Sequence, residues 1–323
     1  MSADTGFGWR PIDAGQVPAW ASLIAAIEAV DHPDEDLGEE YLLEEFADPR
    51  HDFARGSVAV YDGPVMIGYC VLTSRSTADP VHEMRQSGGV HPAYRGRGIG
   101  SALLDWAQRA AVPIHAELHA GQPLSLGGRC LARLDDAVAL LLANGYQQAR
   151  WFRRMVADLT DGVEERPAPA DVEIVRFTAE RSNDALLVRN EAFRDHWGSA
   201  EQTEESWAHF IGYHAFRSSY SFLAYAGAEP LGVVLGHEYE EYNRVSGRRD
   251  LYIPLVGTRR AGRRRGIASA LVTRALRTAR ADGFDTATLD VDADSATGAL
   301  NLYERIGFAV HDTWIVHTKP LTA

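Results

Sequence analysis

The stretch RGRGIGSALL at Arg95–Leu104 recurs later in the chain as RRRGIASALV at Arg263–Val272. Arginine, glycine, isoleucine, serine, alanine and leucine coincide at matching positions of the two stretches. Further matches flank them in the same order, upstream at Gly68 and Gly232 and downstream at Gly145 and Gly307. Because the order of the matches is preserved over most of the chain, the sequence indicates two copies of one domain.

The same succession of elements is predicted around both stretches. Alternating apolar residues are typical of strands, and these lie at Trp9–Ile12, Ser57–Tyr61, Met66–Thr73, Glu173–Phe177, Tyr220–Ala226 and Leu231–Tyr239. A further strand, Ser87–Val90 in the first copy and Leu251–Val256 in the second, runs directly into the arginine–glycine loop. Apolar residues at helical spacing follow each loop and predict an amphipathic helix. The proline-containing, acidic segment Asp158–Asp171 is typical of a linker, so we expect domains at 1–160 and 168–323.

A strand, a loop of small residues and a helix together form a phosphate-binding geometry. Glycine lets the backbone approach a ligand closely, and the first N–H groups of the helix point outward without intrahelical partners. The helix dipole adds partial positive charge at that end, so a pyrophosphate can bind there without a lysine. The arginines of the loop add charge-assisted contacts. The loop alone is also compatible with an ordinary strand-to-helix turn.

The pattern Arg-x-x-Gly-x-Gly/Ala resembles the acyl-CoA pyrophosphate loop of the GNAT superfamily of N-acetyltransferases, most closely in VHPAYRGRGIG at Val90–Gly100. The segment ALNLYERIGF at Ala299–Phe308 is similar to the second signature of that family, on the helix that passes the cofactor thiol. The tandem arrangement resembles the mycothiol synthase-like branch. The resemblance implies an α/β fold of two tandem GNAT-like domains, each a mixed, mostly antiparallel α+β sheet flanked by helices. The central strands are expected to splay apart and admit the pantetheine arm.

The resemblance also implies the reaction. Acetyl-CoA would serve as co-substrate without a metal, and a primary amine of a small molecule would attack the thioester directly in a ternary complex. The identity of the amine stays open between an aminosugar conjugate such as a mycothiol precursor, an antibiotic amine and a protein N-terminus. The implied cofactor-binding residues are Val90, Arg95, Gly96, Arg97, Gly98, Ile99, Gly100 and Ser101 in the first copy, and Val256, Arg263, Arg264, Arg265, Gly266, Ile267, Ala268 and Ser269 in the second.

The two copies differ at the position of the catalytic acid. By the resemblance, Tyr303 donates a proton to the leaving thiolate. Counting back from Gly145 as from Gly307 places Leu141 at the same position of the first copy, and leucine cannot donate a proton. We therefore expect the second copy to carry turnover and the first to be degenerate, with CoA binding by the first copy left open.

The general base is less clearly marked. Many relatives place a glutamate on the strand that leads into the loop, where Tyr252 stands here. Asp250 lies two residues earlier and therefore on the same strand face. The preceding strand ends in further proton acceptors, namely His237, Glu238, Glu240 and Glu241. Asp250 and Glu238 are the candidate pair, acting directly or through water.

Three other segments bear on the site. Asp290, Asp292 and Asp294 mimic the opening of a calcium loop but alternate as on one strand face, which could line the amine pocket. His115 and His119 mimic a zinc pair but fall where the first copy should have a strand, and a histidine pair without metal is favoured. His196 and Trp197 either shape the acceptor pocket or only pack within the protein. In relatives an asparagine that contacts the cofactor commonly precedes the second signature, and Ser295–Gly298 stands there in this sequence.

Composition excludes several classes of protein. Lys319 is the only lysine, which rules out a Walker-type phosphate loop and an internal Schiff-base lysine. A net charge of -13 disfavours nucleic-acid binding, and no apolar run is long enough to span a membrane. With two cysteines and no signal peptide pattern, we expect a cytoplasmic monomer or homodimer. The alternative to an enzyme is a non-catalytic acyl-CoA sensor or scaffold.

Overall fold

The computed structural model describes residues 6–33, 35, 38–75, 78, 81–194, 196, 199, 201–294 and 298–321. The chain divides into two compact units. Unit 1 comprises 1–150 and 314–323, and unit 2 comprises 151–313. Within the described residues, no helix combines the length and the apolar character that crossing a bilayer requires.

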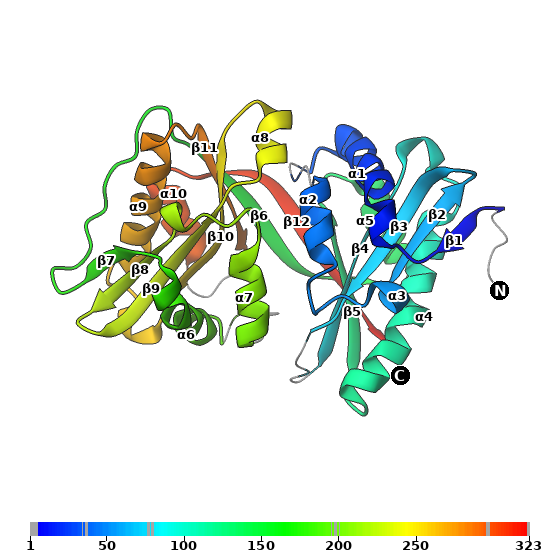
Figure 1. The fold of residues 1–323 in the computed structure, drawn as a ribbon, viewed down its shortest axis with the longest axis horizontal. Coiled ribbons are helices and arrows are strands. Elements are labelled where there is room, and N and C mark those ends of the chain that lie inside the picture. The colour runs from blue at the N-terminus through cyan, green and yellow to red at the C-terminus, as the bar shows by residue number, and fades with distance from the viewer. Residues whose placement is uncertain are drawn as a thin grey trace. The chain divides into compact units, whose positions relative to one another are not determined.

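Unit 1 is a sheet with helices on both faces (Figure 1). Its strands follow the order β1 (Gly8–Arg10), β2 (Ser57–Asp62), β3 (Val65–Thr73), β4 (His82–Val90), β5 (Leu124–Leu131) and β12 (Ala309–Leu321). All neighbours are antiparallel except β4 and β5, which are parallel. One face packs against α1 (Val17–Asp31), α2 (Glu39–Glu45) and α3 (Phe53–Gly56), and the other against α4 (Ile99–His119) and α5 (Asp135–Ala143).

Unit 2 repeats this plan. Its sheet order is β6 (Gln147–Asp158), β11 (Thr286–Asp292), β10 (Asp250–Thr258), β9 (Glu229–His237), β8 (Phe222–Ala226) and β7 (Glu173–Arg176), with β10 and β11 parallel. Helices α9 (Ile267–Ala281) and α10 (Ala299–Ile306) cover one face, and α6 (Ser182–Ala192) and α7 (Glu204–Gly212) cover the other (Figure 1). Helix α8 (Glu240–Ser246) connects β9 to β10. The mixed, mostly antiparallel sheet predicted for each copy is thus confirmed.

The compact units differ from the predicted domains, 1–160 and 168–323, in the last strand of each copy. Phe152–Asp158 of β6 pairs with β11 of unit 2, and Trp314–Leu321 of β12 pairs with β5 of unit 1. Each copy therefore receives its final strand from the other copy's sequence. Because any open edge next to a buried strand offers unpaired N–H and C=O groups that must be satisfied, the strand pattern alone cannot tell which copy provides the partner.

The expectation of a strand at His115–His119 is wrong, because both histidines lie in the last turns of α4. The helix runs through Pro113, which lacks a backbone N–H and costs one helical hydrogen bond. Burial outweighs that loss: Ile114 and His115 are 4% and 1% exposed. Nδ1 of His115 also lies 2.8 Å from Nδ1 of buried His82 on β4.

Candidate functional site

The loop that follows β10 opens the N-terminus of α9. Gly266 occupies the cap position with φ +83°, and no described side chain caps the helix. A Cβ at Gly266 would meet no described atom within 4 Å, so space lies in front of the first helical N–H groups. Gly98 repeats this arrangement at the start of α4, with φ +80° and open space. Both helix ends therefore fit a pyrophosphate.

The first arginine of each loop faces the protein. Arg263 donates to the carbonyl oxygens of Thr258 at 3.3 Å and Ala192 at 3.1 Å. Arg95 donates to Asp31 at 2.8 and 2.7 Å and to the carbonyl of Val90. These guanidinium groups anchor the loops, which leaves backbone N–H groups as the ligand-facing donors.

The second arginine of the unit 2 loop, Arg264, is exposed, and the third, Arg265, is partly buried. Arg264 adopts φ +61°, at the position where unit 1 has Gly96 at φ +76°. Its side chain makes no hydrogen bond or ion pair with any described residue. Arg265 pairs with Asp171 through oxygens at 2.7 and 2.6 Å. Of the loop arginines in unit 2, Arg264 is therefore the side chain best placed to meet a phosphate.

The two central parallel strands separate in both units, as predicted. In unit 2, β10 pairs with β11 only from Asp250 to Tyr252, although both strands continue. The pairing of β10 with β9 shifts register between Tyr252 and Leu255. In unit 1, β4 and β5 pair only as far as Arg85 and Gly127. Each sheet consequently opens between its middle strands, next to the loop that starts the following helix.

Tyr303 lies on α10 within the hydrophobic core on the α9 side of the sheet. It is 8% exposed and its ring meets that of Phe308 edge-on at 5.8 Å. Burial raises the pKa of the Tyr303 phenol above its usual value. Its hydroxyl makes no hydrogen bond with any described residue. The phenol therefore stays protonated and available as a donor.

Leu141 occupies the corresponding place in unit 1. The N–H of Tyr146 donates to the carbonyl of Leu141 at 3.1 Å, as the N–H of Phe308 does to Tyr303 at 3.0 Å. Leu141 is also 8% exposed. The two helices thus end alike, and the residue count that aligned leucine with tyrosine holds in the structure.

Asp250 is buried at the start of β10. One of its carboxylate oxygens accepts hydrogen bonds from Thr286 at 2.6 Å and Thr288 at 2.9 Å on β11. Burial raises the pKa of Asp250, although the two threonines and the charge of Arg154 act in the opposite direction. The carboxyl is therefore fixed close to the point where the strands separate, with a stronger affinity for a proton than an exposed aspartate.

Glu238, the other candidate base, lies just beyond β9 and is tied to arginines. It accepts hydrogen bonds from Arg249 at 2.6 and 3.3 Å and from Arg217 at 3.2 Å. Asn243 donates to it as well, at 3.3 Å. Burial by itself raises the pKa of Glu238, but the hydrogen bonds and charges of the two arginines outweigh burial and lower it. This carboxylate chiefly holds the segment around α8 in place.

Three side chains on adjacent strands, Arg154, Asp290 and Tyr252, form a chain of hydrogen bonds that the sequence did not reveal, here called the relay. Arg154 on β6 donates from Nε and Nη2 to the two oxygens of Asp290 on β11, both at 3.0 Å. The hydroxyl of Tyr252 on β10 donates to the same carboxylate at 3.2 Å. Arg154 belongs to the first half of the sequence, so no local pattern could have linked it to this place.

The chain matches two sequence profiles. Residues 186–308 match the Acetyltransferase (GNAT) family, and residues 54–154 match an Acetyltransferase (GNAT) domain. It is 32% identical over 267 residues to a mycothiol acetyltransferase of Streptomyces avermitilis, covering 79% of this chain and 77% of that protein. It is 30% identical over 310 residues to one of Salinispora arenicola, covering 92% and 91%. This chain is a tandem GNAT N-acetyltransferase.

Solved structures agree with the fold of the acetyltransferase. A GCN5-related N-acetyltransferase from Sphaerobacter thermophilus superposes with a TM-score of 0.80 at 25% identity, covering 100% of this chain and 98% of that one. A tandem GNAT protein from the clavulanic acid biosynthesis pathway gives 0.74 at 16% identity, covering 98% and 99%. At that identity the second likeness concerns the fold alone. The predicted family, tandem fold and enzyme class are confirmed.

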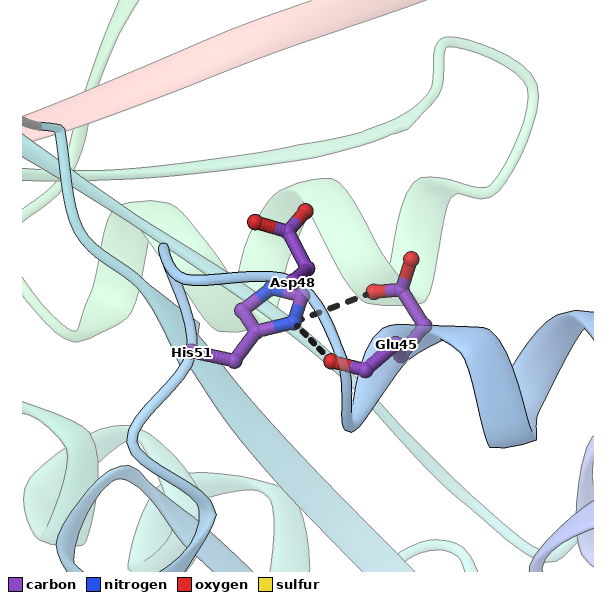
Figure 2. A group of neighbouring side chains, drawn as sticks. All are labelled: Glu45, Asp48 and His51. Carbon is purple, nitrogen blue, oxygen red and sulfur yellow. Dashed lines mark hydrogen bonds and ion pairs between the residues drawn. The ribbon is translucent and has the colours of Figure 1, made fainter. Parts of the chain in front are cut away.

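Figure 2 shows the one group among the described residues whose donor atoms could surround a metal ion, Glu45, Asp48 and His51. Asp48 is already paired with Arg50, at 2.9 and 3.0 Å from Nε. Both ring nitrogens of His51 have partners, the carbonyl of Glu45 at 3.1 Å and the hydroxyl of Thr73 at 2.8 Å. This group fastens the end of α2 to β3 in unit 1, far in sequence from the loops of the acetyltransferase.

Two predicted features of the acetyltransferase fall on positions that the structure does not describe. Trp197 and residues 295–297, which include the expected asparagine position, lie outside the described residues. The ring of His196 lies 5.3 Å from that of Phe193 at the end of α6. Asp290 and Asp292 belong to β11, and Asp294 follows in a turn.

Proposed function

We propose that unit 2 transfers the acetyl group of acetyl-CoA to a primary amine of a small molecule, by direct attack in a ternary complex. One observation carries this proposal: β10 and β11 separate beyond Tyr252 in the unit that also carries the uncapped start of α9 and Tyr303 in the core on the α9 side of the sheet. A ligand with a pyrophosphate at one end and a thioester at the other matches this arrangement. Acetyl-CoA supplies the activated acetyl group, and the protein supplies position and proton transfer.

Each part of the site has a proposed task. The backbone N–H groups from Gly266 to Ser269 hold the pyrophosphate, assisted by Arg264. Val256 and its neighbours on β10, which have no β11 partner beyond Tyr252, line the pantetheine arm. Tyr303 gives its phenolic proton to the sulfur as the carbon–sulfur bond breaks and the amine nitrogen bonds to the acetyl carbon.

The proton lost by the amine needs an acceptor. Of the two predicted bases, Asp250 is favoured, because its raised pKa and fixed position suit proton uptake through a water molecule. Glu238 remains an alternative, but both of its oxygens are engaged by Arg249 and Arg217 and its pKa is lowered. A proton acceptor with a lowered pKa drives proton transfer less strongly.

Unit 1 favours a second task, acyl-CoA binding without turnover. Its loop has the same open geometry at Gly98, and its central strands also separate. Leu141 stands where the catalytic phenol would be. We infer that this unit holds CoA, through Val90 and residues 95–101, in a structural or sensing role.

Calorimetric titration with acetyl-CoA tests both sites. Gly266→Glu and Gly98→Glu would each place a carboxylate in front of one helix start, so each variant should lose one of two binding events. A panel of amines, including mycothiol precursors, antibiotic amines and peptides with a free N-terminus, is assayed by release of the CoA thiol. Folded parent protein that binds no acetyl-CoA would refute the proposed function.

Tyr303→Phe separates catalysis from binding. We expect kcat to fall about 100-fold or more, because general acid catalysis contributes on that order, while the acetyl-CoA dissociation constant stays the same. Tyr225→Phe, which removes a phenolic hydroxyl from β8 that donates to Asp184, is the matched control and should leave kcat unchanged. An unaltered kcat in Tyr303→Phe would remove its assigned role.

A further inference from the structure

The relay of Arg154, Asp290 and Tyr252 lies on one face of the unit 2 sheet. Arg154 is directly opposite Asp290 in the pairing of β6 with β11. Tyr252 is opposite Thr288, two residues before Asp290, so its side chain reaches diagonally along β11 to the carboxylate. This face is opposite to the one that packs Tyr303, since Leu251 and Leu289 between these residues belong to the α9 core.

Tyr252 is the last residue of β10 that pairs with β11. Its side chain therefore marks the inner end of the opening, where the proposed thioester and an approaching amine would meet. The contact between Tyr252 and Asp290 joins the two strands across the beginning of this opening. Asp250, the proposed proton acceptor, precedes Tyr252 by two residues on the same face.

The ion pair between Arg154 and Asp290 holds the relay rigidly. The side chains of Arg154 and Asp290 are only 5% and 14% exposed, and the guanidinium grips the carboxylate with two parallel hydrogen bonds. Such a bidentate pair fixes direction as well as charge. A phenol that donates to a fixed carboxylate has its oxygen oriented, and a phenolic oxygen is an acceptor as well as a donor of hydrogen bonds.

We propose that the hydroxyl of Tyr252 accepts a hydrogen bond from the N–H of the attacking amine and aligns its lone pair with the thioester carbon. Asp290 and Arg154 are positioning residues that act through Tyr252. No covalent bond to the protein forms, and the amine proton leaves to the general base. This inference rests on the proposed function and specifies how its acceptor side recognises a primary amine. It also gives the first half of the sequence a part in the unit 2 site, through Arg154.

The test is steady-state kinetics with the panel amine that the parent protein acetylates with the highest kcat/KM. Tyr252→Phe removes only the hydroxyl and should raise KM for the amine about 10-fold, the usual effect of one lost hydrogen bond. The acetyl-CoA dissociation constant should not change. Tyr225→Phe is the matched control. Tyr225 lies on β8 and donates to Asp184 of α6 at 2.7 Å, so this variant loses a similar hydrogen bond and should leave both constants unchanged.

A double-substitution cycle tests the positioning role. Arg154→Lys alone should lower kcat/KM for the amine several-fold, but in the Tyr252→Phe background it should have no further effect, because both act through the same hydroxyl. A purely structural role of Arg154 would lower kcat/KM equally in both backgrounds. Circular dichroism and acetyl-CoA titration verify that each variant is folded.

The remaining outcomes separate the inference from the proposed function. A KM for the amine in Tyr252→Phe equal to that of the parent would overturn the inference and leave the proposed function intact. Loss of acetyl-CoA binding in Tyr252→Phe would also overturn it, because Tyr252 would then belong to the cofactor side. A parent protein that binds acetyl-CoA but acetylates no amine of the panel would overturn both.

Discussion

Replacing Gly232 by alanine should displace the start of α9 from the sheet. A Cβ at Gly232 would lie 2.8 Å from Cγ2 of Ile267 and 2.8 Å from Cδ1 of Leu271. Carbon atoms pack best at about 3.5–4.0 Å. Both contacted residues are buried, one turn apart on α9, so neither side chain can turn into solvent. Because Cγ2 of Ile267 is attached to Cβ, close to the helix backbone, we expect the start of α9 to move.

The expected loss of stability follows from these contacts. Overpacking a core by one carbon costs about 1–3 kcal/mol, and alanine in a strand recovers about 0.5–1 kcal/mol of the entropy that glycine loses. We expect a net destabilisation of about 1–2 kcal/mol in urea unfolding. Since Ile267 and Leu271 lie in the first turns after Gly266, acetyl-CoA binding by unit 2 should weaken as well.

Urea unfolding and calorimetric titration with acetyl-CoA measure both effects. Gly212→Ala is the control, because a Cβ there meets no described atom within 4 Å and the residue has no positive φ. Gly68→Ala in unit 1 should have a smaller effect, since its closest contact, with Ile99, is 3.2 Å. Unchanged stability and affinity in Gly232→Ala would refute the close packing of α9 on β9. Lower stability with unchanged affinity would refute the link between helix position and binding.

Two further predictions concern the strand exchange and acid stability. A fragment of residues 168–323 should fail to unfold cooperatively when followed by circular dichroism, because it lacks Phe152–Asp158, the partner of β11. A fragment of residues 147–313 retains β6 and should fold better. Equal behaviour of the two fragments would contradict this reasoning. Burial, together with the nearby His119 and His115, lowers the pKa of His82 to about 4. Because the unfolded value is about 6.5, its contribution to stability is complete above pH 6.5 and is lost as the pH falls toward 4. The urea concentration at the unfolding midpoint should fall between pH 6.5 and pH 4, and it should fall less in His82→Asn. An equal fall in the two proteins would contradict the role of His82.

The sequence by itself determined the repeated elements and much of the cofactor side. Glycines at cap positions, apolar residues at strand and helix spacing, and the offset between Tyr303 and Gly307 are local properties, and local backbone preferences largely fix them. The same count correctly aligned Leu141 with Tyr303, because a short helix with the same ending constrains both residues. The start of the loop helices followed from this local information, whereas the separation of the central strands was expected from the resemblance to the GNAT superfamily.

Other features were decided only by the tertiary structure. The sequence did not indicate that Arg263 and Arg95 turn toward the protein, because their partners Ala192 and Asp31 come from distant helices. The wrong expectation of a strand at His115–His119 also reflects tertiary structure. Pro113 disfavours a helix locally, but the burial of Ile114 and His115 maintains it.

The exchange of final strands and the relay of Arg154, Asp290 and Tyr252 depend on long-range pairing. Both copies carry similar strand patterns, so the apolar pattern of each last strand is compatible with either sheet. Which open edge it joins is decided by hydrogen bonding and burial of the whole assembled sheet. The sequence therefore determined what each segment would form, and the tertiary structure decided which segments share a site.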